Sequence, residues 1–214
     1  MRSSSRLMHH LAQSGAILSD DGRYRYALHR PARRTDRPVL FVMLNPSTAD
    51  ALASDHTLTK CQRFAKRWGL GPVLVGNLFA WRATAPRDLW LSQQHCDIVG
   101  PDNERWLDAL MEHAERVVVG WGDQPGANEQ TTRFLHRYQR RTLTCLGTTK
   151  SGAPKHPSRP AYGTRCVPFT PVSCRGARLD GVASSVTARL AAPSSRLASR
   201  TPRQETALPR SSAT

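Results

Sequence analysis

The sequence has few acidic residues, few cysteines and no long apolar run, and each shortage excludes a class of protein. Its 16 Asp and Glu stand against 31 Lys and Arg. The five cysteines include no Cys-x-x-Cys pair, the spacing typical of zinc and iron–sulfur sites. No apolar stretch approaches the roughly 18 residues that span a bilayer, and residues 1–5 lack the apolar core of a signal peptide. We therefore expect a reduced, cytoplasmic protein with no membrane segment, metal or cofactor.

Three short motifs are also missing. The chain has no Gly-x-x-x-x-Gly-Lys phosphate loop, no Gly-x-Gly-x-x-Gly fingerprint and no Gly-x-Ser-x-Gly nucleophile elbow. These absences argue against the common nucleoside triphosphatases, dinucleotide enzymes and serine hydrolases. A metal site built from His56, Asp55 and His156 remains an alternative to a metal-free site.

The formal charge of +15 favours an anionic partner, either nucleic acid, DNA first, or a nucleotide. A solvated basic surface with a basic tail explains the same charge. We expect one domain over residues 15–172, a flexible segment 1–14 and a disordered tail 173–214, in a monomeric protein. The tail is rich in Ser, Ala, Arg, Thr and Pro and has few large apolar residues that could form a core.

Apolar patterning predicts the fold. Four apolar runs predict strands, at 38–44, 73–79, 116–122 and 142–146. Three segments with apolar residues at helical spacing predict helices, at 55–68, 100–114 and 131–140. The alternation predicts an α/β fold, a three-layer α/β/α sandwich with a four-stranded parallel sheet. The turn signal Asp20-Asp21-Gly22 predicts an N-terminal β-hairpin over 15–28, which could cover one sheet edge.

Unusual polar and aromatic side chains follow each predicted strand. In an open parallel sheet, ligands bind beyond the carboxyl ends of the strands, so we expect these residues to share one site. The candidates are Asn45, Pro46, Ser47, Thr48 and Asp55 after the first strand, Asn77, Phe79 and Arg82 in and after the second, Trp121 after the third, and Lys150, His156 and Ser158 after the fourth.

Several candidates also have a structural explanation. Asn77 either braces a loop or binds a ligand, because a buried amide must find partners. Asp55 either caps a helix or positions water. Trp121 either fills the core or stacks on a base. His156 either polarises a developing anion or is an exposed loop histidine.

Ordered motifs give the chain a family resemblance. They are Met43-Leu44-Asn45-Pro46-Ser47-Thr48-Ala49-Asp50, Asn77-Leu78-Phe79-Ala80-Trp81-Arg82-Ala83-Thr84, Gly100-Pro101-Asp102-Asn103, Trp121-Gly122, and residues 146–157 with the sequence LGTTKSGAPKHP. By these motifs the chain resembles the bacterial family known as domain of unknown function 1643, over roughly residues 15–170. That family name implies no activity.

The layout also resembles, more distantly, the uracil-DNA glycosylase superfamily. The segment 44–47 is similar to the Gly-Ile-Asn-Pro-Gly motif of the mismatch-specific branch, and 156–158 matches the His-Pro-Ser motif that follows the last strand. The resemblance implies that Asn45 orients the attacking water, Asn77 hydrogen-bonds the flipped base and His156 stabilises the charge on the departing base. It thus implies hydrolysis of an N-glycosidic bond in DNA. A non-catalytic nucleic-acid-binding module and an enzyme acting on a free nucleotide or other small phosphorylated substrate are the alternatives.

Overall fold

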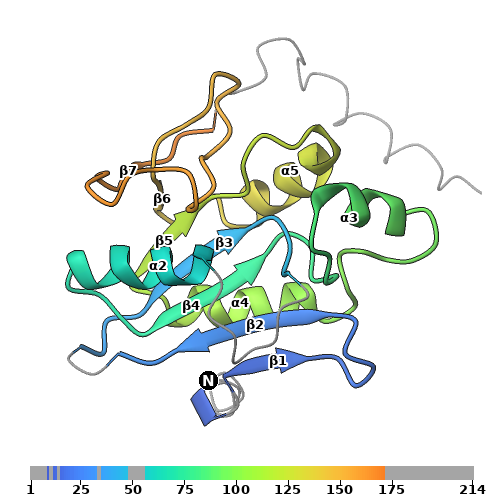
Figure 1. Cartoon of the computed structure of the whole chain (residues 1–214), viewed down its shortest axis with the longest axis horizontal. Helices are drawn as coiled ribbons and strands as arrows, with labels where there is room; N and C mark the ends of the chain where they lie inside the picture. Colours follow the sequence, from blue (N-terminus) through green and yellow to red (C-terminus); the bar gives the residue numbers. More distant parts are fainter. Residues whose placement is uncertain (1–8, 10–11, 14, 33–34, 48–55, 172–214) are drawn as a thin grey trace, which may run out of the picture. The chain divides into compact units, whose positions relative to one another are not determined.

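The computed structural model describes residues 9, 12–13, 15–32, 35–47 and 56–171 (Figure 1). All of them belong to the first of two compact units of the chain, Met1–Val172. The predicted tail 173–214 and most of the predicted N-terminal segment 1–14 lie outside the described residues, as do two candidate site residues, Thr48 and Asp55.

The core of the fold is a mixed sheet of seven strands in the order β1-β2-β4-β3-β5-β6-β7. Their bounds are Ala16–Leu18 for β1, Arg25–Arg30 for β2, Val39–Met43 for β3, Val73–Asn77 for β4, Arg116–Val119 for β5, Leu143–Cys145 for β6 and Val167–Pro168 for β7. The prediction of a four-stranded parallel sheet is therefore wrong.

The parallel strands form the centre of this sheet, and antiparallel strands extend both of its edges. β4, β3, β5 and β6 run parallel, whereas β2 pairs antiparallel with β4 and β7 pairs antiparallel with β6. Without a neighbour, the outer edge of β4 would present unpaired backbone N–H and C=O groups. β2, the second strand of the predicted β1–β2 hairpin, pairs with this edge. The sheet is mixed because β2 and β7 join the parallel strands in the antiparallel sense.

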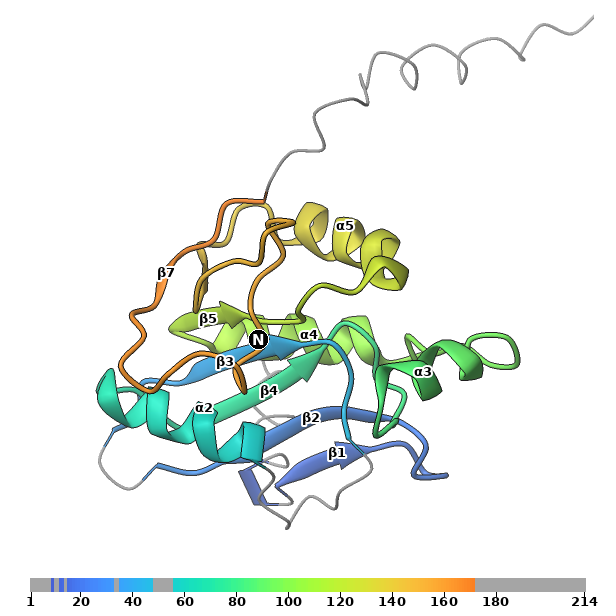
Figure 2. The ribbon, with the colours of Figure 1, turned by 45° about the horizontal axis from the view of Figure 1, so that its top comes forward.

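Helices cover both faces of the sheet. α2 (His56–Arg67) packs its buried Leu58, Cys61 and Phe64 against the face that carries Val39 and Phe41 of β3. The alternate β3 residues face the other cluster, which includes side chains from α3 (Pro86–Ser92), α4 (Asn103–His113) and α5 (Asn128–Arg137). Figure 2 shows α2 and α4 on opposite sides of the strands.

The three longer helices correspond to predicted segments, whereas α3 and the short 3-10 turn η1 (Pro125–Ala127) were not predicted. No helix among the described residues is long and apolar enough to cross a membrane.

Backbone hydrogen bonds continue past the ends of the parallel strands and fix the loops that follow. The N–H groups of Leu78 and Phe79 donate to the carbonyls of Met43 and Leu44, each at 2.9 Å. On the other side of β3, Gly120 N–H donates to the Val42 carbonyl at 2.8 Å. The turns after β3, β4 and β5 are therefore held together at one edge of the sheet.

Candidate functional site

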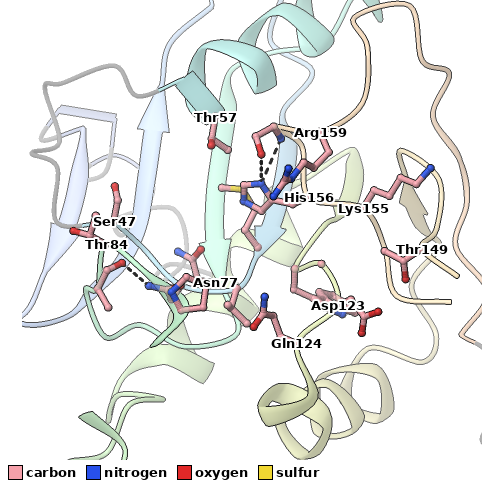
Figure 3. A pocket seen from close by; sticks show the side chains of 18 of the residues that line it. Ser47, Thr57, Asn77, Thr84, Asp123, Gln124, Thr149, Lys155, His156 and Arg159 are labelled. Atoms are coloured by element: carbon pink, nitrogen blue, oxygen red, sulfur yellow. Dashed lines mark hydrogen bonds between the residues drawn. The ribbon is translucent and has the colours of Figure 1, made fainter. Parts of the chain in front are cut away.

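A pocket of about 510 Å³ lies at this edge, beyond the carboxyl ends of β3, β4 and β5 (Figure 3). Six of the predicted site residues line it: Asn45, Ser47, Asn77, Trp121, His156 and Ser158. In the view of Figure 3, Ser47 and Thr84 lie on one side of the site, and Lys155 and Thr149 lie on the other. The topology therefore brings together polar residues that are more than 100 positions apart in the sequence.

Four other predicted residues do not line the pocket. The ring of Phe79 is buried and meets Trp90 edge-on, with ring centroids 5.4 Å apart. Arg82 donates from Nη1 to the Gly22 carbonyl at 2.9 Å, so it braces the hairpin turn. Pro46 is buried and accepts from the Ala83 N–H through its carbonyl, and Lys150 is exposed in the loop after β6.

Asn45 ties two loops of the pocket together. Its Nδ2 donates to the carbonyl of Ala83 at 2.8 Å and to that of Pro46 at 3.1 Å. Both amide hydrogens are thereby directed at backbone oxygens, so the side chain is held in one orientation. Its Oδ1 is left as the group that can accept a hydrogen bond from a ligand or water.

Asn77, the last residue of β4, presents a buried amide to the pocket. The residue is 3% exposed, and its Oδ1 has no hydrogen-bond partner among the described residues. Side chains of two helices hold its backbone. Asn103 Nδ2 of α4 donates to the carbonyls of Asn77 and Leu78 at 3.1 Å each. Gln130 Nε2 also donates to the Leu78 carbonyl, at 3.2 Å. These side chains therefore support the turn after β4, whereas no group in the described part of the chain donates to Asn77 Oδ1.

His156 is oriented by its neighbour two residues along the chain. Its Nδ1 lies 2.8 Å from Ser158 Oγ and accepts from the Ser158 N–H at 3.4 Å. Because a backbone N–H can only donate, Nδ1 is the acceptor, and the proton of the neutral ring is assigned to Nε2. A neutral His156 of this tautomer is a hydrogen-bond donor through Nε2.

The Trp121 ring belongs to the core as well as to the pocket wall. The residue is 4% exposed, and its ring meets those of Phe134 and Phe169 edge-on, at centroid distances of 5.6 and 5.9 Å. These contacts match the core role that the sequence left open. Trp121 is also one of the residues that line the pocket.

The remaining lining residues include several that sequence analysis missed. The polar ones are Arg25, Thr57, Thr84, Asp123, Gln124, Thr149, Lys155 and Arg159. Three of them, Arg25, Lys155 and Arg159, are cations, whereas Asp123 is the one carboxylate among the described residues that line this pocket. Asp123 accepts from Ser151 Oγ at 2.7 Å. The pocket wall is therefore basic, which favours an anionic or acceptor-rich ligand.

Within the described part of the chain, no group of three or more His, Cys, Asp or Glu side chains is placed to bind a metal ion. Cys61, Cys96, Cys145 and Cys166 are free thiols. The described residues that line the pocket offer amides, an imidazole and cations.

The fold and the described residues define an α/β protein with an amide-lined, largely basic pocket at the carboxyl edge of its parallel strands. The sequence matches the family of proteins of unknown function DUF1643 over residues 25–158, which is more than half of the chain, and the protein belongs to this family. The matched segment contains every residue that lines the pocket except Arg159. Neither the curated proteins nor the solved structures contain a significant match.

Proposed function

We propose that the pocket binds a nucleobase and that the protein hydrolyses the N-glycosidic bond of a base in DNA. The observation that carries this proposal is the convergence of Asn45, Asn77 and His156 on one pocket. They lie after the first parallel strand, at the end of the second and after the last. That layout agrees with the resemblance to the uracil-DNA glycosylase superfamily.

Asn77 is suited to hold the base. An amide offers one acceptor and two donor hydrogens, so it can pair with the edge of a heterocyclic ring. The buried Oδ1 lacks a partner among the described residues, and an unsatisfied buried acceptor costs about 1–3 kcal/mol. A ring N–H of a bound base would remove that cost, so the pocket is prepared for a ligand that donates there.

Asn45 is suited to position the attacking water, and His156 is suited to stabilise the departing base. The Oδ1 of Asn45 accepts a hydrogen bond from a water molecule and directs its oxygen toward C1′ of the sugar. The bond between C1′ and the base nitrogen breaks, and its electron pair leaves with the base. The water oxygen bonds to C1′, and its proton passes to solvent. His156 donates from Nε2 to the departing base and stabilises its negative charge.

The basic wall supports a nucleic-acid substrate. Lys155 is largely exposed where it lines the pocket, and so is Arg159. Cations at the rim can meet the phosphates that flank a flipped nucleotide, and such contacts help to offset the few kcal/mol that flipping costs. The same cations would suit the phosphate of a free nucleotide, which makes a nucleotide hydrolase the second candidate.

The proposal is tested by incubating the protein with DNA duplexes that carry uracil, mismatched or modified bases and scoring abasic sites. Wild-type protein is expected to produce abasic sites on at least one duplex, and Asn45→Ala and His156→Ala are expected to be slower by about 100-fold or more. DNA binding without cleavage on any duplex would instead support a non-catalytic module. Hydrolysis of free nucleotides alone would support the second candidate.

A further inference from the structure

Arg25 reaches the pocket from the edge hairpin, outside the parallel strands that carry the other key residues. In the β1–β2 pair, Ile17 lies opposite Ala27 but Leu18 lies opposite Arg25, so Tyr26 is an extra residue on β2. An extra residue of this kind is a β-bulge, which interrupts the regular alternation of side chains along the strand. Arg25 therefore lies outside the regular pairing of Ala27 and Leu28 with β1, and it lines the pocket.

The position of Arg25 is fixed by its backbone and by burial. Its N–H donates to the Ala80 carbonyl at 2.9 Å, in the turn that follows Asn77. The residue is only 7% exposed, and it lines the pocket together with Asn77 and Thr84. A guanidinium held this deep is costly unless polar groups or a ligand compensate its charge.

The chemistry of Arg25 differs from that of Asn77 in one respect. The amide of Asn77 can face a ligand with its oxygen or its nitrogen, so by itself it accepts either a carbonyl or an amino group on a base. A guanidinium carries five N–H donors and no acceptor, and it stays charged at any ordinary pH. A base carbonyl beside Arg25 would be bound, whereas an amino group there would meet a second donor and a positive charge.

We propose that Arg25 is a base-contacting residue that makes the pocket selective for bases carrying carbonyl oxygens over bases carrying amino groups. The inference rests on the proposed function, because it takes a nucleobase as the ligand. It adds a residue from the hairpin to the binding site and assigns the choice of base to Arg25. Lys155 and Arg159 remain available at the rim for phosphate.

The test is calorimetric binding of four free bases, with uracil and hypoxanthine as the carbonyl bases and cytosine and adenine as the amino bases. Wild-type protein is expected to bind the carbonyl bases at least about tenfold more tightly, the discrimination expected of a good arginine contact. Arg25→Gln supplies a carbonyl that can accept from an amino group, so the preference is expected to fall below about threefold. Arg23→Met is the control, because Arg23 is exposed, is paired with Asp21 and does not line the pocket.

Arg25→Lys guards against a folding defect, since lysine keeps the charge and offers only donors. This variant is expected to retain the preference for carbonyl bases with weaker affinity. An unchanged preference in folded Arg25→Gln, or loss of preference in folded Arg25→Lys, would overturn the inference and leave the proposed function standing. If wild-type protein binds none of the four bases, the inference is overturned, and the abasic-site assay alone decides the proposed function. An Arg25-dependent preference without any abasic sites on DNA would support the inference and contradict the hydrolytic function.

Discussion

Lys60 Nζ donates a hydrogen bond of 2.8 Å to the carbonyl of Ser158, and so joins α2 to the loop that carries His156. The same ammonium donates to the Pro160 carbonyl at 2.6 Å and lies 5.2 Å from the centroid of the Tyr162 ring. Lys60 is 6% exposed, so its charge is compensated by these backbone oxygens and the ring. Lys60 therefore supports the loop that carries His156.

Lys60→Met is therefore expected to destabilise the protein and to loosen the His156 loop. Methionine fills a similar volume but leaves two carbonyls without their donor, at a cost of about 1–3 kcal/mol for each buried group. Thermal unfolding measures the loss of stability, and abasic-site formation measures the effect on the site. Lys66→Met is the matched control, because Lys66 is exposed on the same helix. Equal melting temperatures for the two variants would contradict the support role of Lys60.

Gly120→Ala, directly after β5, is expected to displace the loop that carries His156. A Cβ at position 120 would lie 2.9 Å from Pro157 Cδ and 3.1 Å from the Lys155 carbonyl oxygen, and Pro157 follows His156 directly. The loop must shift to make room, so base binding and abasic-site formation should fall together. Gly163→Ala, where a Cβ would meet nothing within 4 Å, is expected to behave like wild type. Full activity of Gly120→Ala would show that the close approach has no functional consequence.

The parallel strands were predictable because they lie in apolar runs, and in β3 the run from Val39 to Val42 is buried on both faces. β7 was not, because a two-residue strand, Val167–Pro168, carries no periodic signal. α3 was missed because its single buried residue, Leu89, makes no apolar stripe. The sheet order also depends on pairing between distant segments, which a local pattern does not contain.

The site was predictable only where a local sequence pattern marks a residue. Asn77 stood out because an amide in an apolar strand needs a partner. Arg25 did not, because the bulge at Tyr26, which breaks the regular strand pairing beside it, has no clear sequence signature. The sequence predicted Lys150 as a site residue, but Lys155 of the same loop lines the pocket instead, because the loop folds back on itself. Thr149 N–H donates to the Ala153 carbonyl, which leaves Lys150 near the tip of the loop.

Asn103→Asp is expected to disturb the backbone that carries Asn77. Asn103 is fully buried and its Nδ2 donates to two carbonyls, whereas a carboxylate of the same shape cannot donate while ionised and would be repelled by them. We expect a stability loss of about 2 kcal/mol or more and weaker base binding, measured by denaturant unfolding and calorimetry. Asn128→Asp, at an exposed position at the start of α5, should leave both quantities near the wild-type values. A stable Asn103→Asp with unchanged base affinity would contradict the bracing role.

Acid stability should depend on Asp108 of α4. The Arg137 guanidinium donates to its carboxylate and, with the Tyr138 hydroxyl, holds the pKa of Asp108 below its usual value of 3.8. Because the folded state has the lower pKa, the ionised carboxylate stabilises the fold above about pH 4, and this stability is lost as the pH falls through the lowered pKa. Unfolding free energies measured from pH 7 to pH 2 should therefore fall more steeply in wild type than in Asp108→Asn. Parallel curves would show that the ion pair contributes nothing measurable to the free energy of unfolding, which is the case for many exposed ion pairs.

The most direct test of the account is a single-turnover assay that quantifies the free base released from DNA by wild-type protein and by Asn77→Ala. The account predicts that wild type releases the base in a one-to-one ratio with abasic sites. It also predicts that Asn77→Ala, if it folds with a near-normal melting temperature, releases the base about 100-fold more slowly or worse, because the buried amide that holds the base is gone. Release of no base from any DNA, or equal rates for the two proteins, would contradict the central claim that this pocket hydrolyses an N-glycosidic bond.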